Sequence, residues 1–130
     1  MLDVRRESVE VASQVFSPRN APKGPVKSFD YAPGGTVEVP VVLIRLGDMV
    51  LAGVQPELSA SIGARIKAGS PFAGTVVATM IDGSAKYMPD ATSYDRFTYE
   101  ARSSPFAKGA AEAAASGIIE HIKRMKDAGN

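Results

Sequence analysis

The chain has 130 residues, 45% of them hydrophobic, which suits a single domain with a buried core. Its 15 basic and 14 acidic residues leave a formal net charge of +1, which excludes a global electrostatic field that would attract nucleic acid or an anionic membrane. The absence of cysteine excludes a disulfide framework and any thiolate metal site.

The N-terminal sequence MLDVRRESVEV carries charges where a signal peptide needs an apolar stretch. No run in the chain approaches the roughly 20 apolar residues of a membrane-spanning helix. We therefore expect a soluble chain with no signal peptide and no membrane-spanning segment. Its cellular location stays unknown.

The first part of the chain has no clear pattern. Residues 4–16 mix valines with polar residues without a clean period, so strand and helix both remain open. Residues 17–35 contain four prolines that interrupt any regular ladder or helix: Pro18, Pro22, Pro25 and Pro33. We expect residues 1–35 to form an irregular N-terminal arm or loop and residues 36–130 to form an α/β domain.

A β-hairpin is predicted over residues 36–54. Two runs rich in β-branched residues, TVEVPVVLIRL and MVLAGV, flank Gly47 and Asp48, where glycine supplies the positive φ of a tight turn. Pro40 cannot donate to a ladder, so we expect it at a strand edge or a bulge.

A helix is predicted over residues 56–68. Pro56 stands in its first turn with Glu57 beside it, and Gly69 marks its end. Apolar side chains recur at steps of four residues: Leu58, Ile62 and Ile66.

The remaining elements are a strand, a loop and a helix. TVVATMI, residues 75–81, has the composition of a buried strand. The stretch between residues 82 and 106 is polar and contains four aromatic residues, and loops longer than about 12–15 residues are usually functional or disordered. Residues 106–126 are alanine-rich and end in basic residues, which favours a helix. The order of elements predicts an α/β fold: a small mixed β-sheet packed by two helices.

Glu57 is a candidate metal ligand because it lies where a strand ends and a helix starts, the place where open α/β sheets bind ligands. The alternative is an acidic residue that stabilises the first turn of a helix. Residues alone favour that alternative.

The aromatic stretch offers a second set of candidates. A phenol of Tyr87, Tyr94 or Tyr99 can bind a divalent cation or donate to an oxyanion. The alternative is that these rings pin a long loop onto the core. His121, the single histidine, stands among basic residues near the end of the final helix and is most simply a solvated residue.

Two stretches together resemble the neutral/alkaline, non-lysosomal ceramidase family near the end of its catalytic domain. VVLIRLGDMVLAGVQPELSASIGARIKAGSPF is similar to that family's strand, Gly-Asp turn, second strand and helix start. KYMPDATSYDRFTYEARSSPF is similar to its tyrosine loop, and residues 107–125 resemble the helix that follows. The resemblance covers roughly residues 37–125.

The resemblance implies a partial version of a larger zinc amidohydrolase domain. Zinc in that family is held by two histidines, a glutamate and a tyrosine, and activates water against the amide of ceramide, a sphingolipid. Position by position, the glutamate corresponds to Glu57 and the metal-ligand tyrosine to Tyr87. Tyr99 matches the tyrosine that stabilises the oxyanion. Members of the family are often secreted or periplasmic.

The chain also departs from the family's pattern. Ala101 and Arg102 follow the Tyr99-Glu100 pair where the family has small residues, and Gln55 stands where a glycine is common. No histidine matches either histidine ligand, because His121 lies on a different element. We therefore expect the isolated chain to be inactive and to hold zinc weakly or not at all, with a missing N-terminal catalytic portion or a partner chain supplying histidines.

Two further functions stay open: a non-enzymatic α/β binding or oligomerisation module, and a small-ligand carrier using the aromatic stretch. A reading frame that extends upstream into a histidine-rich segment would favour the enzyme. If the chain is part of a larger domain, its uncovered surface predicts a homo-oligomer.

Overall fold

The structure is a computed structural model of the chain and describes residues 1–16 and 23–129. The strands are β1 (Leu2–Val15), β2 (Ala32–Leu46), β3 (Met49–Val54), β4 (Glu57–Leu58), β5 (Gly74–Ala78) and β6 (Tyr87–Met88). The helices are α1 (Ala60–Gly69), α2 (Ala91–Asp95), α3 (Tyr99–Arg102) and α4 (Ala110–Ala128).

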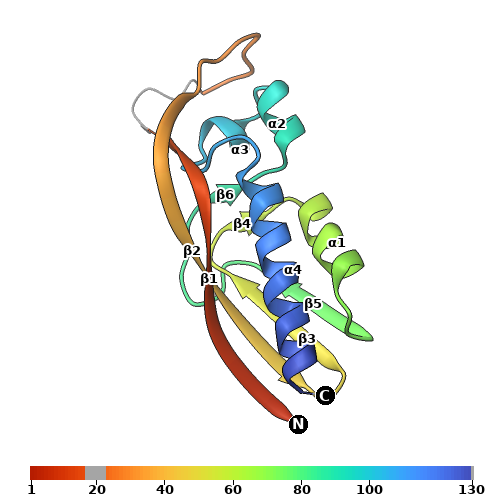
Figure 1. Cartoon of the computed structure of the whole chain (residues 1–130). Helices are drawn as coiled ribbons and strands as arrows, with labels where there is room; N and C mark the ends of the chain where they lie inside the picture. The colour runs from red at the N-terminus through yellow and green to blue at the C-terminus, as the bar shows by residue number, and fades with distance from the viewer. Residues whose placement is uncertain (17–22, 130) are drawn as a thin grey trace.

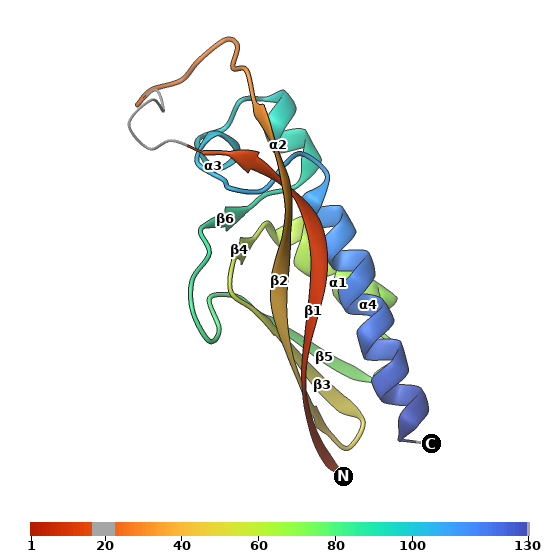
Figure 2. The ribbon, with the colours of Figure 1, turned by 60° about the vertical axis from the view of Figure 1, so that its left-hand side comes forward.

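The main sheet has four strands in the order β1-β2-β3-β5. β1 pairs antiparallel with β2 and β2 antiparallel with β3, whereas β3 and β5 are parallel because α1 carries the chain back between them. Figures 1 and 2 show α1 and α4 together on one side of this sheet. The prediction of a mixed sheet packed by two helices is confirmed.

The expectation of an irregular arm is wrong for residues 2–15, which form the long edge strand β1. Their exposed and less exposed positions alternate, with Val9 and Val11 facing the helices and Arg6, Ser8 and Glu10 facing away. Polar residues on the uncovered face obscure the pattern of a strand in the sequence. The conformation of residues 2–15 is determined instead by pairing with β2 along nearly the whole length of β1.

Part of the predicted proline-rich arm can be compared with the structure. Residues 17–22 lie outside the described residues, and residues 23–31 are irregular as expected. Residues 32–35 already belong to β2, paired with the end of β1. Pro40 lies one residue beyond the section of β2 that β3 covers, so its missing N–H is tolerated there.

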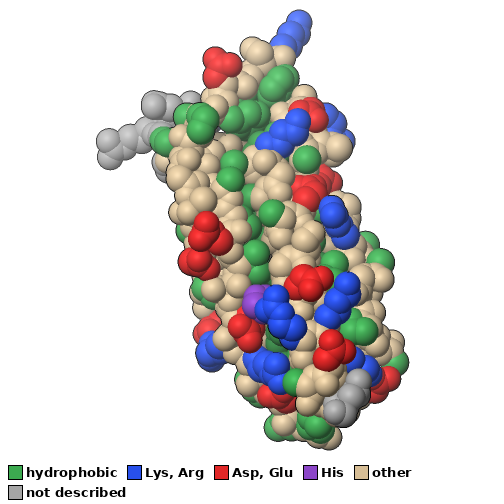
Figure 3. Space-filling view, viewed as in Figure 1, with side chains coloured by type: hydrophobic (Ala, Val, Ile, Leu, Met, Phe, Trp, Pro, Cys, Tyr) green, Lys and Arg blue, Asp and Glu red, His purple; other side chains and the backbone are tan. Residues whose placement is uncertain are grey.

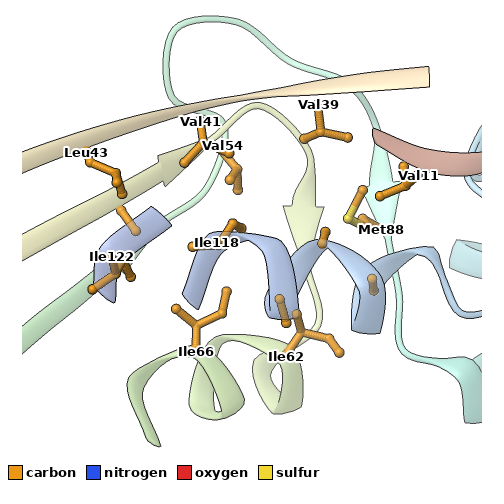
Figure 4. Close-up of a cluster of buried hydrophobic side chains, with 14 of the residues drawn as sticks. Val11, Val39, Val41, Leu43, Val54, Ile62, Ile66, Met88, Ile118 and Ile122 are labelled. Atoms are coloured by element: carbon orange, nitrogen blue, oxygen red, sulfur yellow. The ribbon is translucent and has the colours of Figure 1, made fainter. Parts of the chain in front are cut away.

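The core lies between the sheet and the two longer helices (Figure 4). Leu43 and Val41 of β2 face Ile118 and Ile122 of α4, and Ile66 of α1 packs from the other side. The hairpin turn is as predicted, with Gly47 at φ 62°. The final helix is confirmed, although it begins at Ala110 rather than at residue 106.

Helix α1 begins later than predicted, at Ala60 instead of residue 56. Glu57 and Leu58 are drawn into a two-stranded parallel sheet with β6, which removes them from the helix. Ser59 precedes the helix but makes no side-chain cap, because its hydroxyl accepts a hydrogen bond from the Asp90 N–H at 3.0 Å.

Residues 82–106 are not a single loop as expected. They contain β6 and two short helices, α2 and α3. Asp90 accepts from the Ser93 N–H at the start of α2, and Thr98 accepts from the Ala101 N–H at the start of α3. Within the described part of the chain, no helix is long and apolar enough to cross a membrane.

Candidate functional site

The site lies at the parallel pair of β4 and β6, just after the chain leaves β3. Glu57 and Tyr87 are direct partners in this parallel pair, and the Glu57 N–H donates to the Lys86 carbonyl at 2.8 Å. Neighbouring strands lie about 4.8 Å apart, so the two residues start from adjacent backbone positions. Lys86 has a φ of 60°, a left-handed conformation that is strained for a residue with a long side chain. In this conformation its carbonyl accepts the Glu57 N–H.

A small hollow of about 130 Å³ opens beside these strands. It is lined by Glu57, Leu58, Ser59, Tyr87, Pro89 and Glu100. Glu57 and Glu100 are exposed and Tyr87 is half-buried. The hollow thus gathers two carboxylates and one phenol within reach of solvent.

Tyr99, the first residue of α3, does not line this hollow but contacts Tyr87, which does. Its ring meets the Tyr87 ring edge to face, with centroids 5.9 Å apart and an interplanar angle of 72°. The Tyr99 side chain is 54% exposed. The structure therefore brings all three predicted site residues together.

Ser104 is hydrogen-bonded to the backbone of Tyr87. Its buried hydroxyl donates to the Tyr87 carbonyl at 2.7 Å and accepts from the Phe106 N–H at 3.0 Å. Gln14 of β1 donates from Nε2 to the Ser104 carbonyl at 2.7 Å and to the Ala101 carbonyl at 3.0 Å. The N-terminal strand is thereby tied to the segment that carries Tyr87 and Tyr99.

Asp90 accepts hydrogen bonds from three side chains near the start of α2. Its carboxylate accepts from the hydroxyls of Ser93 at 2.8 Å, Ser61 at 2.8 Å and Thr92 at 3.1 Å. These hydrogen bonds, led by that from Ser93, lower the pKa of Asp90 because they favour its charged form. The network links α1 to the start of α2 and fixes the segment after β6.

Tyr94 takes the alternative role, in which the ring pins a long stretch of chain onto the core. It is 2% exposed, and its hydroxyl donates to the Phe106 carbonyl at 2.6 Å. Burial raises the pKa of Tyr94 to about 12. Tyr94 therefore pins the stretch to the core, whereas Tyr87 lines the hollow and Tyr99 packs against Tyr87.

Glu57 does not have the alternative role of an acidic residue that stabilises the first turn of a helix, because α1 has no acidic residue in its first turn. His121 lies on α4 beside β1, with Nε2 2.9 Å from the Ser8 carbonyl and Nδ1 3.7 Å from the Glu7 carboxylate. Figure 3 shows it among charged side chains of both signs on the surface of that helix. It takes no part in the hollow.

The hollow supplies oxygen donors of the kind that zinc accepts, a carboxylate and a phenol. Zinc sites in enzymes generally have three protein ligands, so Glu57 and Tyr87 make an incomplete set. Among residues 1–16 and 23–129, no three His, Cys, Asp or Glu side chains gather closely enough to hold a metal ion.

Sequence patterns missed the residues that support the site. Ser104 and Asp90 stand outside any apolar period, so nothing in the sequence marks the Ser104 hydroxyl as buried. The only usable signal was Asp90 before Ala91, Thr92 and Ser93, which is typical of a helix start.

The fold and hollow define a mixed α/β unit with a small acidic and phenolic site at one end of its sheet. No sequence profile of a protein family matches the chain, and no curated protein matches it. Solved structures do. A ceramidase complexed with C2 is similar over 98% of this chain and 30% of its own, with a TM-score of 0.70 and 12% identity.

The neutral ceramidase from Pseudomonas aeruginosa is similar in the same way. The match covers 98% of this chain and 29% of that chain, with a TM-score of 0.71 and 12% identity. The predicted resemblance is thus confirmed at the level of the fold: the chain has the fold of a part of a neutral ceramidase, and spans less than a third of its length.

Proposed function

We propose that this chain is a segment of a ceramidase-like zinc amidohydrolase that lacks part of the metal site. The observation that carries the proposal is the in-register pairing of Glu57 with Tyr87 beside Tyr99, the three positions that the family resemblance singles out. Similarity of fold to two ceramidases supports it independently.

In this proposal Glu57 and Tyr87 hold the metal through their oxygen atoms. Zinc, when bound, supplies activation of water for attack on an amide. Tyr99 donates a hydrogen bond from its hydroxyl to the oxyanion that develops on the substrate, because its ring contacts Tyr87 and its side chain is exposed. Ser104 positions Tyr87 through the backbone.

The missing histidines come from a portion outside this chain. Each matched ceramidase is more than three times as long as the part that the match covers. Either an N-terminal catalytic portion or a partner chain would supply them. Alone, the chain is inactive. The substrate class is an acyl amide, with a sphingolipid as the first compound to test.

The alternative function is a non-enzymatic binding or oligomerisation module. One observation favours it: the sheet has an uncovered face with exposed large hydrophobic side chains at one end. A homo-oligomer follows from either function. A histidine-rich reading frame upstream would favour the enzyme.

The proposed ligand pair can be tested on the purified chain with cobalt(II), a spectroscopic substitute for zinc, and imidazole to stand in for the missing histidines. We expect cobalt to bind with a visible absorption band that weakens strongly in Glu57→Gln and in Tyr87→Phe. Glu10→Gln, an exposed glutamate on β1, is the matched control and should leave binding unchanged. Equal binding by all four proteins would refute the assignment.

A further inference from the structure

We propose that the uncovered face of the main sheet is a contact surface between two copies of this chain. Helices α1 and α4 cover only one face (Figures 1 and 2). We call the apolar end of the other face the open patch. Its residues are Leu2, Val4, Ile44, Leu46, Met49, Leu51 and Val76, with Ile81 beside them.

The strand register makes these side chains one continuous surface. Leu2 is opposite Leu46, and Leu46 is opposite Met49, so the first row crosses three strands. The second row crosses four, in the order Val4, Ile44, Leu51 and Val76. Directly paired residues point to the same face of a sheet, so both rows face away from the helices.

Two glycines, Gly53 and Gly74, lie close to side chains of the open patch. Gly74 ends the first row, where a Cβ would lie 3.1 Å from two atoms of the Met49 side chain. Gly53 follows the second row, and a Cβ there would lie 3.0 Å from the Ile81 side chain. Met49 and Ile81 therefore lie flat against the sheet, which keeps the open patch even.

The open patch is large enough for a specific contact. Apart from Leu51, which is half-buried, its residues are between 36% and 69% exposed. Together they present roughly 600 Å² of surface, at the upper limit for the largest patch of an ordinary monomer and most of the roughly 800 Å² that each partner contributes to a standard interface.

Its chemistry favours another apolar sheet. Neither row contains a charged residue, and charge begins further along the face with Arg6, which pairs with Asp82 at 2.6 Å, and with Glu10 and Glu38. Surfaces that bind anionic lipid carry several lysines and arginines around the apolar residues, whereas Arg6 beside this patch is already paired with Asp82. Two twisted sheets of the same kind pack face to face without needing opposite charges.

A second copy of the chain meets these requirements. In a twofold dimer each copy contributes the same patch, so an apolar surface without charge is complementary to itself. This proposal does not rest on the ceramidase-like site, because the open patch contains neither Glu57 nor Tyr87.

Light scattering coupled to size exclusion at tens of micromolar chain tests it. We expect a dimer for the native chain and a monomer for Leu46→Glu. Val15→Glu is the matched control, because Val15 is 65% exposed and Leu46 66%, on strands of the same sheet, but Val15 lies at the opposite end of β1. Circular dichroism confirms that each variant is folded.

The absence of native cysteine allows a second test. A spin label on Ile44→Cys should report a short distance between copies, and one on Val37→Cys, an exposed residue outside the open patch, a long one. A native monomer, or a dimer that survives Leu46→Glu and keeps Ile44 labels far apart, would overturn the proposal. The patch would then be left for a different polypeptide, such as the remaining portion of a ceramidase-like domain.

Discussion

Glu57 and Tyr87 are in-register partners of a parallel two-stranded sheet, although a helix and a strand separate them along the chain. This pairing places a carboxylate and a phenol at one hollow. It is the relationship on which the proposed metal site depends.

The isolated chain should show no hydrolysis of ceramide or of simple acyl amides, with or without added zinc, because Glu57 and Tyr87 supply fewer than the three ligands of an ordinary catalytic zinc site. Release of fatty acid or free amine is the measurement. Zinc-dependent turnover that disappears in Glu57→Ala would show that a complete site assembles in some other way.

Ser104→Ala should destabilise the fold by about 1–3 kcal/mol, because it leaves the part-buried Tyr87 carbonyl and the buried Phe106 N–H without this partner. Urea unfolding followed by circular dichroism gives the free energy. Ser116→Ala, an exposed serine on α4, is the control and should change stability by less than about 0.5 kcal/mol. Equal effects of the two substitutions would mean that the Ser104 hydroxyl does not support the site.

Gly117→Ala should destabilise the chain even though alanine favours helices by about 1 kcal/mol over glycine. A Cβ at Gly117 would lie 2.6 Å from the Val9 side chain, which is β-branched and stiff. Gly63→Ala in α1, whose Cβ would meet its nearest atom at 4.0 Å, should instead be stabilising by about 0.4–1 kcal/mol. Thermal unfolding should show that Gly117→Ala lowers the stability and that Gly63→Ala raises it. Combining Val9→Ala with Gly117→Ala should reduce the loss of stability.

Asp90 should contribute to stability in a pH-dependent way. Its pKa is lower in the folded chain, so its contribution is present above the unfolded value of about 3.9 and is lost as pH falls through the folded pKa. Urea unfolding between neutral pH and pH 2 should therefore show a shallower acid loss in Asp90→Asn than in the native chain. Ser116→Ala, which removes no titratable group from the surface of α4, is the control and should keep the native profile.

Tyr94 should ionise above the ordinary range of a tyrosine. Its neutral form is favoured by burial, so the stability that it contributes is complete below the unfolded pKa of about 10 and falls as pH rises towards the folded pKa of about 12. An ultraviolet titration of phenolate should show a late phase near pH 12, and Tyr94→Phe should remove that phase. A titration that is complete near pH 10 would contradict the buried placement.

Local patterns determined the hairpin around Gly47, the final helix and the mixed α/β class, because turn chemistry and apolar period act over a few residues. The residues alone offered Glu57, Tyr87 and Tyr99 among several candidates, and the family resemblance singled them out and gave them their roles. Only the tertiary structure decided that residues 2–15 form a strand, since pairing with β2 outweighs their polar composition. The same long-range pairing, β4 with β6, removed Glu57 from the predicted helix and set it opposite Tyr87. Contacts between distant segments carry no signal in a single sequence, and the candidate site consists of such contacts.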